Sequence, residues 1–264
     1  VESDLAPPPG DCATPSEAGA YGSPDLFPLV FAASVDSFDC IDDGKAGTDA
    51  LVIKHVLPRP ISDNPRDSGS GGDSSPGNGV IDSLQDGRVY VMTSNVGGLL
   101  FDGAAPPTIT TGGEFPDGTA WEYQYEIFYI RQPQPTDVPR LARRVLSYNP
   151  TTSAMEFVTE DLAEGVEELH LLFGYDDNGD GEVDTYTDVA TIEDENWSDE
   201  WLNVESLEVF MLIRNATEDM QYKDRKTYTL GSETVGPLDD HYRRLISHSS
   251  VSLRNLKLII RGEA

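Results

Sequence analysis

Hydrophobic and polar residues alternate along much of the chain with the two-residue period of β-strands, and this pattern predicts a β-rich protein. The clearest runs are "WEYQYEIFYIRQ" (121–132), "VEELHLLFGY" (166–175) and "NVESLEVFMLIR" (203–214). Alternate positions of a strand share one face of its sheet. The faces expected to be hydrophobic consist of Tyr123, Tyr125, Ile127, Tyr129, Leu169, Leu171, Phe173, Tyr175, Leu207, Val209, Met211 and Ile213.

Shorter signals complete the predicted set of strands. "GTDALVIKHVL" predicts a turn followed by a strand over 50–57, and "RVYVMTS" predicts another strand. "RLARRVLSYNPTTSAMEFVTEDL" predicts a hairpin that turns at Asn149-Pro150, and "RRLISHSSVSLRNLKLII" closes the chain. "DLFPLVFAASVDSF" is compatible with a short helix or a strand. No internal repeat and no long amphipathic helix is evident.

Two segments are predicted to be irregular. Residues 1–25 are rich in Pro, Gly, Ala and Ser, and residues 62–79, "SDNPRDSGSGGDSSPGNG", are polar and of low complexity. Neither flank of 62–79 resembles a complete domain. We therefore expect a long, flexible surface loop within a single domain that spans residues 1–264.

The charge balance limits the classes of partner. The chain has 47 acidic and 18 basic side chains, and its formal net charge is −29. Nucleic acids and anionic membranes would be repelled by such a surface, so neither is an expected partner. A solvated acidic surface with no further role is the simpler interpretation. No stretch approaches the roughly 20 apolar residues of a membrane span, and the N-terminus does not resemble a signal peptide.

The two cysteines, Cys12 and Cys40, lie in an acidic region rich in Pro, Gly and Ser. No second pair accompanies them to indicate a zinc site. We interpret them as a disulfide of an exported protein, with two free thiols as the alternative.

An acidic loop, "DDNGDGEVD" (176–184), is the strongest candidate site. Calcium prefers six to eight oxygen ligands, which alternate residues of a short loop can supply. Position 6 of the loop is Gly181, where unusual backbone angles are needed. Glu182 would contribute its backbone carbonyl, and Asp184 a carboxylate or a water-bridged contact. The predicted calcium ligands are Asp176, Asn178, Asp180, Glu182 and Asp184.

The loop departs from the helix–loop–helix calcium site at position 12. A bidentate Glu is typical there, and this chain has Thr187. We therefore expect a shorter calcium loop between strands, with a plain Asp/Asn/Gly turn as the alternative. Three crowded carboxylates should repel one another without metal, so a calcium ion would order the loop.

No catalytic pattern is found. His55, His170, His241 and His248 are scattered, and the sequence has no nucleophile elbow, phosphate-binding loop or dinucleotide fingerprint. A pair of carboxylates is expected by chance in a chain with 47 acidic residues, so such a pair is no evidence for catalysis. The tyrosines of 121–132 are interpreted as cross-strand packing rather than a ligand-stacking stripe. The chain is not predicted to be an enzyme.

The order of several segments resembles PilW-type minor pilins of type IV pili. These segments are "AEGVEELHLLFGY", "DDNGDGEVD", "WSDEWLNVESLEVFMLIR" and "YRRLISHSSVSLRN", with "GTDALVIKHV" and "YEIFYIRQ" upstream. The resemblance is patchy over 47–57 and good over about 120–255. The hydrophobic N-terminal helix that defines a pilin is missing from this chain.

The resemblance implies an α+β, β-rich fold: a pilin-like domain of antiparallel sheets with long loops, on which the N-terminal helix packs. It implies a non-enzymatic minor pilin, exposed outside the cell, that primes pilus assembly and forms a tip complex. Its partners would be other minor pilins, the major pilin and a tip adhesin. It would contact the membrane only through the missing helix. The alternatives are a J-type minor pseudopilin of type II secretion and a secreted calcium-dependent hydrolase or carbohydrate-binding module.

Overall fold

Strands dominate the computed structural model, in which 53% of the described residues are in strands and 4% in helices. The described residues are 30–38, 40–61, 81, 84–94, 97–110, 112–193 and 203–253. The predicted irregular segments 1–25 and 62–79 lie outside them. No helix within these ranges is long and apolar enough to cross a membrane. The β-rich prediction is confirmed.

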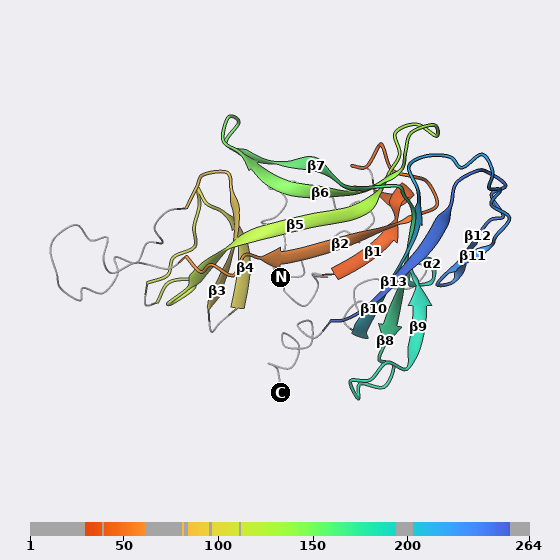
Figure 1. The fold of residues 1–264 in the computed structure, drawn as a ribbon. Coiled ribbons are helices and arrows are strands. Elements are labelled where there is room, and N and C mark those ends of the chain that lie inside the picture. The colour runs from red at the N-terminus through yellow and green to blue at the C-terminus, as the bar shows by residue number, and fades with distance from the viewer. Residues whose placement is uncertain are drawn as a thin grey trace.

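The first sheet has seven strands and is organised around the long strand β5 (Thr119–Arg131) (Figure 1). One side of β5 pairs with β2 (Asp49–Val56), whose outer neighbour is β1 (Val30–Ser34). The other side pairs along its first residues with β3 (Val89–Ser94), whose outer neighbour is β4 (Gly97–Asp102). Along its later residues it pairs with the hairpin of β6 (Arg140–Asn149) and β7 (Ala154–Glu164). The strand alternative for 25–38 is correct at β1, and the hairpin predicted at Asn149-Pro150 is confirmed.

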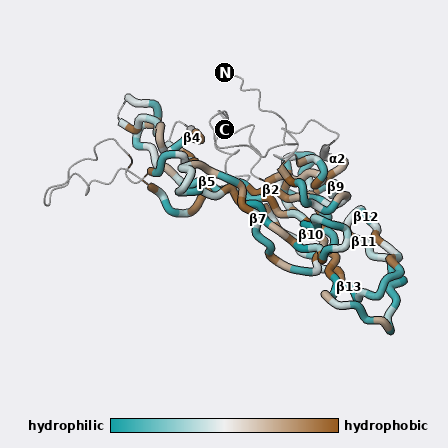
Figure 2. Tube along the Cα trace, turned by 90° about the horizontal axis from the view of Figure 1, so that it is seen from above, coloured by the Kyte–Doolittle hydropathy of each residue, from teal (hydrophilic) through white to brown (hydrophobic). Residues whose placement is uncertain are grey.

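The second sheet has the order β13-β10-β8-β9 and is antiparallel. Its strands are β8 (Val166–Tyr175), β9 (Thr185–Asp188), β10 (Val204–Arg214) and β13 (Arg244–Ser252). A short helix, α2 (Val189–Glu193), follows β9. The hairpin of β11 (Tyr228–Leu230) and β12 (Glu233–Val235) lies beside β10. Figure 2 shows β4 at one end of the molecule and β11, β12 and β13 toward the other.

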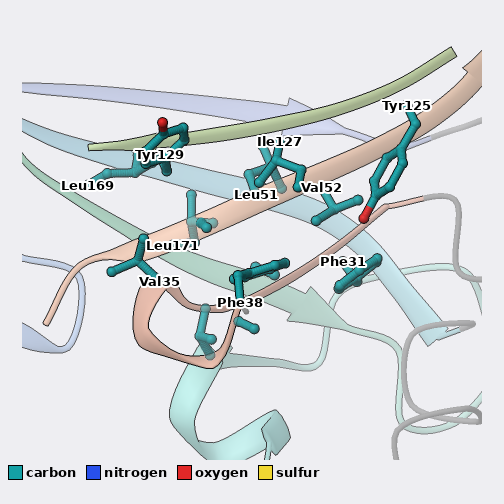
Figure 3. Close-up of a cluster of buried hydrophobic side chains, with 14 of the residues drawn as sticks. Phe31, Val35, Phe38, Leu51, Val52, Tyr125, Ile127, Tyr129, Leu169 and Leu171 are labelled. Carbon is teal, nitrogen blue, oxygen red and sulfur yellow. The ribbon is translucent and has the colours of Figure 1, made fainter. Parts of the chain in front are cut away.

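The main core lies where the two sheets meet. The predicted alternation is confirmed there, because Tyr125, Ile127 and Tyr129 are at most 1% exposed and the hydrophobic face of β8 is buried with them. Figure 3 shows side chains of β1, β2, β5 and β8 gathered in this cluster. The tyrosines of β5 are therefore packing residues, as predicted, and not a surface stripe. A second cluster surrounds β3 and β4.

One lysine is buried in the main core. Lys54 of β2 is 3% exposed, and its Nζ lies 5.1 Å from the ring centroid of Phe31 and 5.2 Å from that of Tyr125. Burial disfavours a charged ammonium group, and it lowers the pKa of Lys54 to about 7. The aromatic faces offset only part of the lost hydration.

Candidate functional site

The predicted calcium loop connects β8 to β9 and is closed at its base by backbone hydrogen bonds. The N–H of Asp184 donates to the carbonyl of Tyr175 at 2.7 Å, and the N–H of Asp176 donates to the carbonyl of Asn203 at 3.0 Å. These bonds continue the pairing of β8 with its neighbours into the loop. The second sheet therefore fixes the point at which the loop leaves and returns.

Asp176 organises the loop through its carboxylate. Its Oδ1 accepts hydrogen bonds from the N–H groups of Gly179 at 2.7 Å and Asp180 at 3.2 Å, and its Oδ2 accepts from Gly181 at 2.7 Å. Gly179 and Gly181 have φ angles of 80° and 89°, which favour glycine. The predicted need for glycine at position 181 is confirmed.

The electrostatics of Asp176 follow from these donors. Desolvation by burial acts to raise the pKa of this carboxyl group, but the N–H groups of residues 178–181 act to lower it, and the net pKa lies below its ordinary value. The carboxylate is held ionised by the loop backbone itself.

The remaining predicted ligands lie in the same loop. The side-chain amide of Asn178 donates to both carboxylate oxygens of Asp184, at 3.1 and 3.0 Å. The Oδ1 of Asn178 accepts from the N–H of Asp180 at 2.9 Å, and the Oδ1 of Asp180 accepts from the N–H of Glu182 at 2.8 Å. The loop therefore places its acidic groups against backbone and amide donors.

The predicted ligands suit a hard cation, because each of them would coordinate the ion through an oxygen atom. Within the described ranges, no three His, Cys, Asp or Glu side chains are arranged to hold a metal ion. The hydrogen bonds within the loop are a feature that we did not predict. Calcium binding by this loop stays a prediction.

The other sequence candidates are dispersed. His55 is exposed on β2, whereas His248 stacks on Phe210 at 4.4 Å between ring centroids. His170 is buried in the middle of β8, and His241 lies in the loop before β13. Cys12 lies outside the described residues, so its predicted disulfide with Cys40 stays a prediction.

A buried ionic network, which we did not predict, supports the start of β13. The guanidinium group of Arg244 contacts the carboxylates of Glu167, Asp224 and Asp240, with Nη1 3.0 Å from Asp224 and Nη2 2.6 Å from Asp240. The Arg244 side chain is 2% exposed and that of Asp224 is 0% exposed. Tyr228 also donates to Asp224, at 2.8 Å.

This network joins three distant parts of the chain. Arg244 lies on β13, Glu167 lies on β8, and Asp224 and Asp240 lie on the two arms of the segment that carries β11 and β12. It therefore fixes that segment to the second sheet. The sequence signal was the Arg pair at 243–244, but no local pattern connects it to residues 167, 224 and 240.

Two edge strands expose hydrophobic side chains. Among the described residues, β13 pairs only with β10, and β7 pairs only with β6. The large hydrophobic side chains exposed on these two strands are Leu245, Ile246, Val251, Val158 and Leu162. An open strand edge offers unpaired backbone groups to another chain, so both edges are candidate surfaces for subunit contacts.

Residues 127–255 match the family model of the type IV pilus-assembly protein W. The match begins within β5 and continues to the end of β13, so it includes the acidic loop, the buried ionic network and both exposed edges. No curated protein and no solved structure is significantly similar to the chain.

Proposed function

We propose that this chain, whose residues 127–255 match the family of the type IV pilus-assembly protein W, is a minor pilin that primes pilus assembly and contributes to the tip complex. The family match is the observation that supports this most directly. In this proposal the described sheets form the globular part of an α+β pilin-like fold, and an N-terminal helix packs on it. The protein would then work outside the cytoplasm, at the cell envelope and on the pilus.

The structure supports a role in assembly through its surfaces. The open edges of β7 and β13 are suited to pairing with neighbouring subunits, which in a pilus would be other minor pilins, the major pilin or a tip adhesin. The proposed role is non-enzymatic, in keeping with the pilus-assembly family that the chain matches.

Genetic deletion tests the proposal. A strain that lacks the gene should lose surface pili, and the wild-type gene should restore them. Cross-linking on the intact cell should join the protein to other minor pilins. Normal piliation with a loss of secreted enzymes would instead identify a type II secretion pseudopilin and contradict the proposal.

We also propose that calcium stabilises the β8–β9 loop. Asp176, Asn178, Asp180, Glu182 and Asp184 would hold the ion, which would neutralise the clustered negative charge. Excess chelator should then lower the melting temperature of the wild type, and Asp180→Ala should remove this dependence. Isothermal titration with calcium chloride gives the affinity directly. An unchanged melting curve in chelator, together with no heat of binding, would contradict the proposal.

A further inference from the structure

The strand β13 forms one edge of the second sheet and lies toward one end of the molecule (Figure 2). Among the described residues it pairs only with β10, through all nine of its residues and with no register shift. Leu245, Ile246 and Val251 are 58%, 41% and 45% exposed. β13 is therefore a long, regular edge strand with exposed apolar side chains on both of its faces.

This edge has none of the features that usually protect an edge strand, which are charged side chains, prolines and bulges. The range Leu245–Ser252 contains no Asp, Glu, Lys, Arg or Pro. The charged residue of β13, Arg244, is 2% exposed and belongs to the buried ionic network. His248 lies against Glu208 of β10. In a chain with a net charge of −29, β13 itself carries no acidic group that would repel a second copy.

The other exposed edge, β7, has the opposite character. It carries Glu156, Glu160, Asp161 and Glu164, and a register shift interrupts its pairing with β6. A second copy placed along β7 would bring acidic side chains against acidic side chains. The sequence of β7 thus opposes self-association, and the sequence of β13 does not.

The backbone groups of β13 point alternately toward β10 and away from it. At one end of the strand the N–H of Leu253 donates to the carbonyl of Glu205 at 2.8 Å, and at the other end the carbonyl of Arg243 accepts the N–H of Asn215 at 3.1 Å. The odd-numbered residues of β13 therefore direct their backbone groups to β10. The even-numbered residues direct theirs to the open edge.

These outward groups fit a second copy in a symmetric antiparallel pairing. A two-fold axis at His248 would align the even-numbered residues of both strands over their full length, so that they exchange backbone hydrogen bonds. On the face of the odd-numbered residues, Leu245 of each copy would lie opposite Val251 of the other, and Ser247 opposite Ser249. Apolar side chains would then meet apolar ones, and hydroxyl groups would meet hydroxyl groups.

We propose that two copies of this chain associate through β13, so that their second sheets join into one continuous antiparallel sheet. The occupant of the edge is a second copy because the strand is complementary to itself and bears no acidic side chain. The inference goes beyond the proposed function, which does not specify whether the neighbour at β13 is a different subunit or the same one.

Sedimentation of the whole chain measures the association. A monomer–dimer equilibrium is expected. The dimer should be favoured at about 1 M sodium chloride, where charges act over about 3 Å, relative to about 0.1 M, where they act over about 10 Å, because the two acidic chains repel each other. A chain that stays monomeric in high salt at about 1 mM, the weak end of specific association, would overturn the inference.

One substitution on each edge strand separates the two surfaces. Leu245→Glu should weaken the dimer by at least about tenfold, because it places a carboxylate opposite Val251 in both halves of the interface. Val158→Glu, the same kind of change on β7, is the matched control and should leave the dissociation constant unchanged. The two original side chains are 58% and 41% exposed in the single chain, so neither change should disturb the fold. Equal effects of the two variants would contradict the assignment to β13.

Cysteine cross-linking tests the register. Opposite residues that exchange backbone hydrogen bonds have Cα atoms about 5.5 Å apart, within the range of about 4.4–6.8 Å that a disulfide spans. His248→Cys, at the proposed axis, should therefore give a disulfide-linked dimer under mild oxidation. Ser250→Cys is the matched control: it would lie opposite Ile246 and about 13 Å from its own equivalent, so it should link only when mixed with Ile246→Cys. Peptide mapping distinguishes these links from bonds to Cys12 or Cys40.

Two cross-linking results would overturn the inference. One is a link through Ser250→Cys alone with the same yield as through His248→Cys. The other is a link from His248→Cys to a different protein on intact cells with none between copies of this chain. The minor-pilin role fails separately: a dimer together with normal piliation of the deletion strain contradicts only that role, and a monomer together with lost pili contradicts only the β13 dimer.

Discussion

Replacing Lys54 with Met tests the origin of an unusual pH dependence. Lys54 lies in the main core against the rings of Phe31 and Tyr125, and its pKa in the folded protein is lowered from 10.5 to about 7. Met has a similar apolar length and no charge. The Lys54→Met variant should therefore keep the packing and remove the titration.

The magnitude follows from the pKa difference, 10.5 − 7 = 3.5 units. One unit corresponds to about 1.36 kcal/mol, so burying the protonated form of Lys54 costs on the order of 5 kcal/mol. Between pH 7 and 10.5 the unfolded state binds more protons than the folded state, so the free energy of unfolding rises with pH. For this one group the rise between pH 7 and pH 9 is about 2 kcal/mol, and below pH 7 the cost is constant.

Urea unfolding at pH 7, 8 and 9, followed by tryptophan fluorescence, measures this effect. The other titrating groups of the acidic chain cancel in the difference between wild type and variant. Lys54→Met should be the more stable protein at pH 7, and its advantage should shrink by about 2 kcal/mol by pH 9. Lys226→Met, at an exposed position, is the control and should show no such trend.

A difference between wild type and Lys54→Met that stays constant across this range would refute the reasoning. Lys54 would then keep an ordinary pKa in the folded protein, and its burial would not be the desolvating environment that the core geometry implies. A trend of the same size in Lys226→Met would also refute it.

Two further substitutions probe the buried network and one close backbone contact. Arg244→Met should destabilise the fold by about 3–5 kcal/mol, because it removes the buried cation that contacts Asp224 and Asp240 and leaves Glu167 with Arg214 alone. The exposed Arg243→Met should cost less than about 1 kcal/mol in the same urea assay. Equal losses would contradict the assigned role of the network. Gly87→Ala should lower the free energy of unfolding more than Gly47→Ala does. Both glycines have φ 77°, where an alanine is strained by about 1–3 kcal/mol. Only at position 87 would the new Cβ also lie 1.9 Å from a carbonyl oxygen of the β6–β7 turn. Equal thermal stability of the two variants would show that this turn moves away freely.

The strands could be predicted because their signal is local. Alternation in 121–132 and 166–175 reports which side chains face the core, and β5 and β8 bury those residues. The glycine at 181 was predictable for the same reason, since its φ of 89° depends on the loop it belongs to. The short β9 and the β11–β12 hairpin have too few residues for a periodic signal.

The long-range features could not be predicted from local patterns. Arg244 and Glu167 are 77 positions apart, and only the pairing of β13, β10 and β8 brings them together. In the acidic loop the pattern predicted which oxygen ligands are present. It could not predict the direction of the Asp176 carboxylate, because that carboxylate accepts hydrogen bonds from backbone N–H groups of the loop.

The continuous strand β5 has a mechanical consequence. Its first residues pair with β3 and its later ones with β2 and β6, so it links the two hydrophobic clusters of the protein. The hydrogen bonds of antiparallel strands are perpendicular to the strand direction. Tension applied along β5 would load many of these bonds at once in shear instead of opening them one after another, which is the geometry in which a β-sheet resists pulling best.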